Sequence, residues 1–138
     1  MFEGEFLNGN KWNGKIFYPD EKFSELKNGK GYIKEYDFND NLKYVGEYLN
    51  GKKHGNGKEY YEKEKLMFEG DYKNSIKWNG KVYDENCNCI YELKNGTGKV
   101  KEYNILDQLF EGEYLNGKRN GKGKEYYNNG NYYLKENI

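Results

Sequence analysis

The chain is poor in several residues that most small folds use. Its 138 residues include no alanine, one proline and two cysteines, and no apolar run is long enough for a membrane-spanning helix. Cys87 and Cys89 are two residues apart, a spacing that puts strand side chains on one face, so we expect free thiols rather than a disulfide. The 23 basic residues balance the 23 acidic ones, and this zero net charge disfavours nucleic acid as a partner.

Aromatic residues and glycine are abundant instead. Aromatics make up 18% of the chain, including 16 tyrosines, and there are 18 glycines. The apolar content of 35% is below that of an ordinary globular domain and is mostly aromatic. Glycine interrupts every candidate helix, whereas aromatic rings suit a pleated surface. We therefore expect a β-protein held together by rings that pack on each other and on glycine.

The sequence repeats itself. Residues 44–61 are nearly copied as residues 110–127, and a shift of 66 residues also lays Phe2-Glu-Gly on Phe68-Glu-Gly. Self-similarity at a fixed spacing is the signature of an array of small units. An array presents the same surface many times, which favours binding over catalysis at one unique site.

Asn-Gly pairs between short alternating runs predict antiparallel hairpins, because both residues accept the positive φ of a two-residue hairpin turn. We predict an all-β fold: a single-layer, elongated and twisted array of about six antiparallel β-hairpins, similar to a β-solenoid sheet. It forms one domain, residues 1–138, with two three-hairpin blocks, 1–66 and 67–132, and a terminal strand.

The repeated pattern is aromatic-x-Gly-x-aromatic, then Asn-Gly, then Gly-x-Gly, and it resembles the MORN repeat (membrane occupation and recognition nexus). The resemblance covers almost the whole chain and is complete in two units, partial in two and loose in two. These units begin, in that order, at Tyr44 and Phe110, at Phe2 and Phe68, and at Phe23 and Tyr91. The resemblance implies a curved sheet of hairpins with an aromatic-lined groove, and a protein-binding, dimerising scaffold at membranes or cytoskeletal structures.

The second aromatic residue of each unit and the two tryptophans form the candidate partner-binding groove. Strands are expected near 14–18 and 80–83, which leaves both tryptophans in lengthened loops where they are available for contact. In a single-layer sheet the same rings must also pack on each other to keep the sheet folded, so a purely structural role stays open. The candidate groove residues are Phe6, Trp12, Tyr48, Tyr72, Trp78 and Tyr114.

The loops inside the hairpins are basic and contain no acidic residue, whereas the connections between hairpins carry the acids. Because all hairpin loops fall on the same edge of such a sheet, we expect one positive and one negative edge. The positive edge suits an anionic surface, either an acidic protein or phospholipid headgroups. Charge alternation that only maintains solubility is the other interpretation. The candidate residues of this anionic-surface edge are Lys52, Lys53, Lys118, Arg119 and Lys122.

The sequence offers no catalytic set, metal site or cofactor motif. The only histidine, His54, has Asn120 as its repeat equivalent, and no hydroxyl nucleophile has a base at a suggestive spacing. We predict a non-catalytic protein–protein interaction scaffold, with peripheral binding to anionic phospholipids as the alternative. No signal peptide precedes Phe2, so we expect a cytoplasmic protein, peripheral to membrane or cytoskeleton, that binds protein partners and dimerises through its terminal strands. An accessory segment of a larger protein would show the same pattern.

Overall fold

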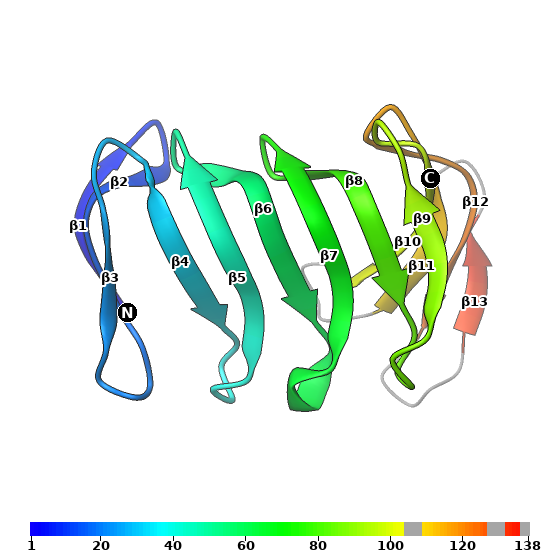
Figure 1. Ribbon diagram of the computed structural model, residues 1–138, viewed down its shortest axis with the longest axis horizontal. Coiled ribbons are helices and arrows are strands. Elements are labelled where there is room, and N and C mark those ends of the chain that lie inside the picture. Colours follow the sequence, from blue (N-terminus) through cyan, green and yellow to red (C-terminus); the bar gives the residue numbers. More distant parts are fainter. Residues whose placement is uncertain (104–108, 127–131, 136–138) are drawn as a thin grey trace.

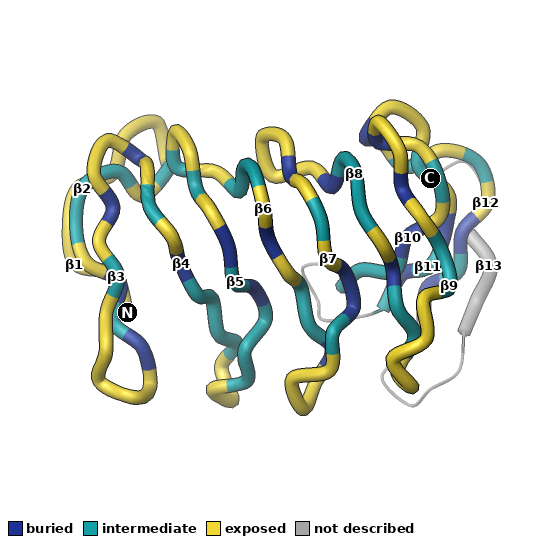
Figure 2. The backbone as a smooth tube through the Cα atoms, in the orientation of Figure 1, coloured by how far each residue is buried: buried dark blue, intermediate teal, exposed yellow. Residues whose placement is uncertain are grey.

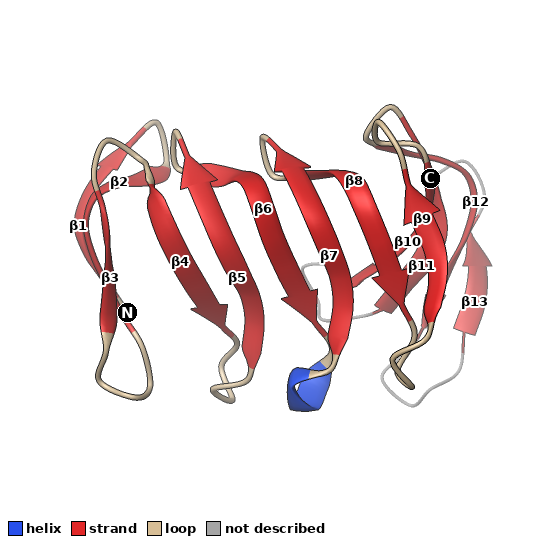
Figure 3. Cartoon of the chain, viewed as in Figure 1, coloured by secondary structure: helices blue, strands red, loops and turns tan. Residues whose placement is uncertain are grey.

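The computed structural model describes residues 1–103, 109–126 and 132–135, and these form thirteen β-strands (Figure 1). Within this part of the chain one short 3-10 turn, Glu62–Glu64, lies between the sixth and seventh strands (Figure 3). The strands are β1 (Phe2–Leu7), β2 (Asn10–Phe17), β3 (Phe23–Leu26), β4 (Gly31–Tyr36), β5 (Leu42–Leu49), β6 (Lys52–Tyr60), β7 (Leu66–Lys73), β8 (Ile76–Tyr83), β9 (Cys89–Leu93), β10 (Gly98–Tyr103), β11 (Leu109–Leu115), β12 (Lys118–Tyr126) and β13 (Tyr132–Lys135).

Consecutive strands pair in antiparallel fashion, but they form three sheets rather than one continuous strip. The sheets contain β1 to β3, β4 to β9 and β10 to β13, each in sequence order. The predicted all-β array of antiparallel hairpins is therefore confirmed. The six-stranded sheet carries the middle of the chain, and the four-stranded sheet turns back behind its far end (Figure 1).

The array breaks at its two shortened hairpins, between β3 and β4 and between β9 and β10. At the first break the strands meet beside their turn through one isolated bridge, Lys27 to Lys30, and the second break has the equivalent bridge. Glycine permits the tight fold, because a Cβ added at Gly31 would lie 2.5 Å from the carbonyl oxygen of Glu25. The units that lack the aromatic-x-Gly opening are thus the corners of the fold.

Tyr18 joins the two strands that separate at the first corner. Its hydroxyl donates to the Ser24 hydroxyl oxygen at 2.6 Å and accepts a hydrogen bond from the backbone N–H of Lys34 at 2.9 Å. Ser24 belongs to β3 and Lys34 to β4. A side chain therefore takes over part of the pairing that the backbone no longer makes across this gap.

The turns of successive hairpins are hydrogen-bonded to each other along one edge of the molecule. The backbone N–H of Gly51 donates to the carbonyl of Gly29 at 2.9 Å, and the N–H of Gly29 donates to the carbonyl of Trp12 at 2.8 Å. The corresponding bonds at the second corner join Gly117, Gly96 and Trp78. This edge, which we call the turn edge, therefore stays continuous where the sheets do not.

Both tryptophans lie in strands, so the prediction that they occupy loops is wrong. Trp12 is in β2 and Trp78 in β8, each close to a corner. A ring carbon of Trp12 lies 2.8 Å from where a Cβ of Gly29 would be, and Trp78 covers Gly96 in the same way. The lengthened segments continue as β-strand, and this extended backbone brings each tryptophan ring to the glycine turn of the next hairpin.

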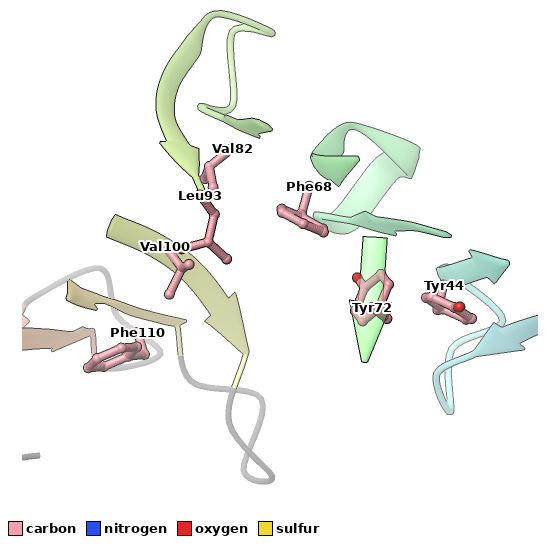
Figure 4. Packing of buried hydrophobic residues seen from close by; sticks show 7 residues of the cluster. All are labelled: Tyr44, Phe68, Tyr72, Val82, Leu93, Val100 and Phe110. Atoms are coloured by element: carbon pink, nitrogen blue, oxygen red, sulfur yellow. The ribbon is translucent and has the colours of Figure 1, made fainter. Parts of the chain in front are cut away.

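The six- and four-stranded sheets share one core, which Figure 4 shows from close by. A smaller cluster of Ile16, Tyr18, Leu26 and Ile33 fills the first corner. Figure 2 shows that buried positions recur strand after strand, while most of the loops at both edges are exposed. The residues of the main core are Tyr44, Phe68, Tyr72, Val82, Leu93, Val100 and Phe110.

Glycines stand opposite each other across neighbouring strands and make room for the core rings. Gly46, Gly57, Gly70 and Gly80 are paired in register from β5 to β8. A Cβ at Gly46 would lie 2.5 Å from the hydroxyl of Tyr44, a ring of the same strand. At Gly57 the rings come both from within the hairpin and from the next one (Tyr44 at 2.7 Å, Tyr72 at 2.9 Å).

Candidate functional site

Seven side chains of alternating charge form one line of ion pairs on the inner face, the side of the six-stranded sheet that carries Tyr44, Phe68 and Tyr72. We call this line the charge ladder. Its acids are the central residues of four Lys-Glu-Tyr tripeptides, and its cations stand one or two residues into the strand that follows a hairpin turn. In the order of their contacts the members are Glu35, Lys53, Glu59, Lys77, Glu102, Arg119 and Glu125.

Lys77 is the centre of the ladder and links two sheets. Its ammonium lies 3.1 Å from a carboxylate oxygen of Glu59 on β6 and 3.3 Å from one of Glu102 on β10. The Lys77 residue is only 5% exposed. The outer pairs are Lys53 with Glu35 (3.8 Å) and with Glu59 (3.6 Å), and Arg119 with Glu102 (3.0 Å) and with Glu125 (3.8 Å). The charge ladder therefore crosses the second corner, where the hydrogen-bonded pairing of neighbouring strands stops.

Three tyrosine hydroxyls donate to the acids of the ladder. They come from the second aromatic of the repeat, so one ring serves both the core and the ladder. The cations also lie over core rings, with Lys53 4.5 Å from the Tyr44 centroid and Arg119 3.8 Å from that of Phe110. The hydroxyl pairs are Tyr48 with Glu35, Tyr72 with Glu59 (2.7 Å) and Tyr114 with Glu102 (2.6 Å).

The ladder holds its members in the charged state. Burial alone would raise the pKa of the Glu59 carboxyl, but Lys77, Lys53 and the Tyr72 hydroxyl outweigh it and lower this pKa to about 2. Burial alone would also raise the pKa of the Glu102 carboxyl, but the charge of Lys77 acts in the opposite direction, and this pKa is lowered. Burial would lower the pKa of Lys77, but Glu59 and Glu102 raise it. These pKa values move away from neutrality, which suits structure and not proton transfer at pH 7.

Two hollows open on the inner face. The N-terminal hollow measures 540 Å³ and is lined by Phe2, Lys11 and Tyr48 among others. The central hollow measures 550 Å³ and lies over the ladder. They share Glu35, Tyr36 and Asp37, which makes them two parts of one groove. Residues that line the central hollow include Tyr36, Phe38, Lys43, Tyr60, Met67 and Tyr103.

The MORN repeat family matches residues 44–63 and 110–132. These matches cover the hairpins β5–β6 and β11–β12, the two units in which the sequence pattern is complete. The chain contains MORN repeats. The resemblance drawn from the sequence is confirmed, and the two matched MORN hairpins supply both outer cations of the charge ladder, Lys53 and Arg119.

The residues predicted for the MORN groove separate into two groups: Tyr48, Tyr72 and Tyr114 pack on one core and turn their hydroxyls to the ladder, whereas Phe6 and the two tryptophans lie elsewhere. Tyr48 lines the N-terminal hollow. Tyr72 and Tyr114 are packed against the core, with their hydroxyls turned to the ladder. Phe6 is 61% exposed on β1, at the outer edge of its sheet. With both tryptophans packed on the turn edge, the groove is lined mainly by other rings.

The residues predicted for the anionic-surface edge divide into two groups. Lys53 and Arg119 turn inward and belong to the ladder. Lys52 and Lys118 are exposed beside their Asn-Gly turns, and Lys122 is exposed further along β12. Adjacent basic residues of a strand point to opposite faces, so each Lys-Lys or Lys-Arg pair gives one residue to the ladder and one to the surface.

Sequence reasoning missed the acids of the ladder, although the sequence carries a signal for them. The tripeptide Lys-Glu-Tyr occurs four times, at residues 34–36, 58–60, 101–103 and 124–126. In β2 and β8 the same place holds Ile16 and Val82, which are buried. A glutamate that alternates with a buried aliphatic residue at one repeat position predicts a buried acid with a partner.

Other kinds of site find little support in the described residues. No group of three or more His, Cys, Asp or Glu side chains there is arranged to hold a metal ion. Nor does any helix in the same ranges have the length and apolar character needed to cross a bilayer. Cys87 and Cys89 are both free and exposed.

Proposed function

We propose that this MORN-repeat protein is a non-catalytic scaffold that binds a segment of a partner protein in the central hollow of its inner face. The observation that carries the proposal is Phe38, whose ring is fully exposed at the rim of that hollow. Large exposed aromatic rings beside a concave surface are typical anchors of protein interfaces. Tyr36, Tyr60 and Tyr103 line the same hollow and offer further rings to a partner.

The charges of the hollow are paired within the protein, which limits what a partner must bring. Lys43 lies 3.8 Å from an Asp37 carboxylate oxygen and 4.2 Å from the Tyr103 ring centroid. Lys53 and Lys77 are held by the ladder. A partner therefore gains most from apolar and aromatic side chains placed against the exposed rings, with hydrogen bonds at the rim.

The test is the Phe38→Ser variant. Because this ring makes few contacts within the protein, its loss should leave the fold intact while lowering recovery of the partner on the order of tenfold. Recovery is measured by quantitative affinity capture from the source cell, followed by a binding titration with the purified partner. Tyr32→Ser is the matched control, since Tyr32 is 60% exposed and lines neither hollow. Equal loss in both variants would contradict a site at the central hollow.

A second candidate function is binding to anionic membranes through the turn edge. The turns contain no acidic residue, and exposed lysines alternate there with exposed aliphatic side chains. Such a combination supports attraction to anionic headgroups with shallow apolar insertion. The exposed aliphatic residues of this edge are Leu7, Leu49, Ile76 and Leu115.

Lys52 and Lys118 allow this candidate to be tested without disturbing the ladder. The double variant Lys52→Glu/Lys118→Glu should reduce co-sedimentation with phosphatidylserine vesicles on the order of tenfold or more at low salt. Binding of the unaltered protein should fall as salt rises, because exposed charges are screened. The membrane candidate is dropped if the unaltered protein stays in the supernatant at low salt.

A further inference from the structure

The internal repeat shows which side chains of the first hairpin lack the covering that their equivalents have. Met1 is 77% exposed, whereas its equivalent Met67 is 1% exposed. Phe6 is 61% exposed, whereas its equivalent Tyr72 is 3% exposed. Lys11 is exposed, but the equivalent residue in β8 is the buried centre of the ladder. The first hairpin therefore exposes the apolar residues that its internal equivalent buries.

The hairpin β5–β6 is what covers these positions in the second block. Tyr44 packs edge-on against Tyr72, with centroids 5.4 Å apart. The Glu59 carboxylate forms an ion pair with the ammonium of Lys77 at 3.1 Å and accepts a hydrogen bond from the hydroxyl of Tyr72 at 2.7 Å. Tyr61 is buried. The strand β6 also pairs with β7 over six residues, so backbone, charge and ring contacts act together.

The first block presents the same receiving surface with its partner side open. β1 is the edge strand of its sheet, so its outer backbone groups face no neighbouring strand in the described part of the chain. Lys11 makes no ion pair with any described residue; its ammonium lies 5.6 Å from the Phe2 ring centroid. Lys11 and Glu35 both line the N-terminal hollow of 540 Å³, although their equivalents at the second corner are ion-paired.

We propose that this N-terminal edge, formed by Met1, Phe2, Phe6 and Lys11, is a docking site for a β-hairpin of a separate partner protein. The hairpin adds a strand antiparallel to β1, places a carboxylate on Lys11 and lays an aromatic ring on Phe6. Its strand has the character of residues 58–61, Lys-Glu-Tyr-Tyr, because in the second block this segment lies beside β7 and its Glu59 pairs with Lys77. This surface differs from the central hollow, so the proposal does not depend on the function proposed above.

A fusion tests whether the surface accepts such a hairpin. Residues 42–66 are placed directly before Met1 of the full chain, which reproduces the natural junction of Leu66 with Met67. The melting temperature should rise, and amide exchange in β1 should slow about tenfold or more, because an edge strand becomes an internal one. The matched control carries Tyr44→Ala and Glu59→Lys in the added hairpin and should show neither change. Equal exchange of β1 in the two fusions would overturn the proposal.

A titration in trans tests whether a separate chain can supply the hairpin. A synthetic peptide of residues 42–65 is added to the full chain, and binding is measured by calorimetry. Lys11→Glu should abolish binding, whereas Lys30→Glu, an exposed lysine on the turn edge, should leave it unchanged. No heat of binding, or equal loss in both variants, would overturn docking by a partner chain. Concentration-dependent growth of the full chain that Lys11→Glu abolishes would also overturn it, because the occupant would then be a second copy.

Discussion

Replacing Lys77 with methionine should destabilise the protein by about 3 kcal/mol, the largest effect we expect from a single substitution that preserves side-chain volume. The change leaves the buried carboxylates of Glu59 and Glu102 without their shared cation. Each acid keeps one other cation, Lys53 or Arg119, which places the cost at the lower end of the range for broken buried ion pairs. The measurement is urea unfolding at pH 7, followed by tyrosine and tryptophan fluorescence.

The internal repeat supplies the control for this substitution. Lys11 is the equivalent of Lys77 but is exposed and makes no ion pair with a described residue, so Lys11→Met should change the free energy of unfolding by less than about 0.5 kcal/mol. The triple variant Lys77→Met/Glu59→Gln/Glu102→Gln should recover part of the lost stability, because it removes the two carboxylate charges that Lys77→Met leaves without their shared cation. Equal effects of Lys77→Met and Lys11→Met would show that the ladder does not stabilise the fold.

The charge ladder meets two requirements of a sheet with one open face: it gives partners to the polar ends of the core rings, and it holds cations over those rings. A row of glycines leaves the inner face shallow, so rings lie flat over the backbone and their polar ends reach the surface of the core. Tyr72 and Tyr114 direct those ends to acids, and the acids in turn hold the cations over the rings. Polar networks stabilise a structure when every member has a partner. The same residues therefore close the core and fix the angle at which β10 crosses behind the six-stranded sheet.

The fold could be predicted from the sequence because its information is local. Asn-Gly pairs fix the turns, as at Asn50 and Gly51, which both have positive φ. The alternation within each run fixes which side chains share a face. The breaks after β3 and β9 could not be predicted, since they depend on how closely two backbones approach at Gly31 and at Gly98. The breaks coincide with the shortened units of the repeat, but the sequence of these units does not predict the direction in which the chain continues.

The candidate site was predicted less well because its contacts join distant parts of the chain. Lys77 and Glu102 lie 25 residues apart and meet only because the four-stranded sheet turns back. The lysines of the loops looked alike in the sequence, but alternation sends Lys52 outward and Lys53 inward. Phe38 is not part of the repeated sequence pattern, so the repeat gives no reason to expect an exposed ring at this position. The predicted dimer through the terminal strands, residues 2–6 and 131–135, stays a prediction, and residue 131 of the second strand lies outside the described residues.

Acid should remove the stability that the ladder supplies, and the direction follows from the pKa values. The pKa of the Glu59 carboxyl is lowered from 4.5 to about 2 on folding. A lowered pKa means that the unfolded chain binds the proton more readily, so the stabilisation is present above about pH 4.5 and is lost as the pH falls towards 2. The shift corresponds to about 3 kcal/mol at neutral pH. The lowered pKa of Glu102 adds to the loss in the same direction.

The Glu59→Gln variant isolates this contribution from other acids, among them Asp37 and Asp84, whose pKa values are also lowered. The free energy of unfolding of the unaltered protein should exceed that of Glu59→Gln by its largest margin at pH 6 to 7, and the margin should shrink between about pH 4.5 and 2 as the carboxyl becomes protonated. Glu62→Gln, an exposed position in the 3-10 turn, should match the unaltered protein at every pH. A buried carboxyl governed by desolvation alone would give the opposite sign, with a margin that grows as the pH falls. A margin for Glu59→Gln that grows in acid, or that stays constant with pH, would therefore contradict an ionised glutamate held between Lys53 and Lys77.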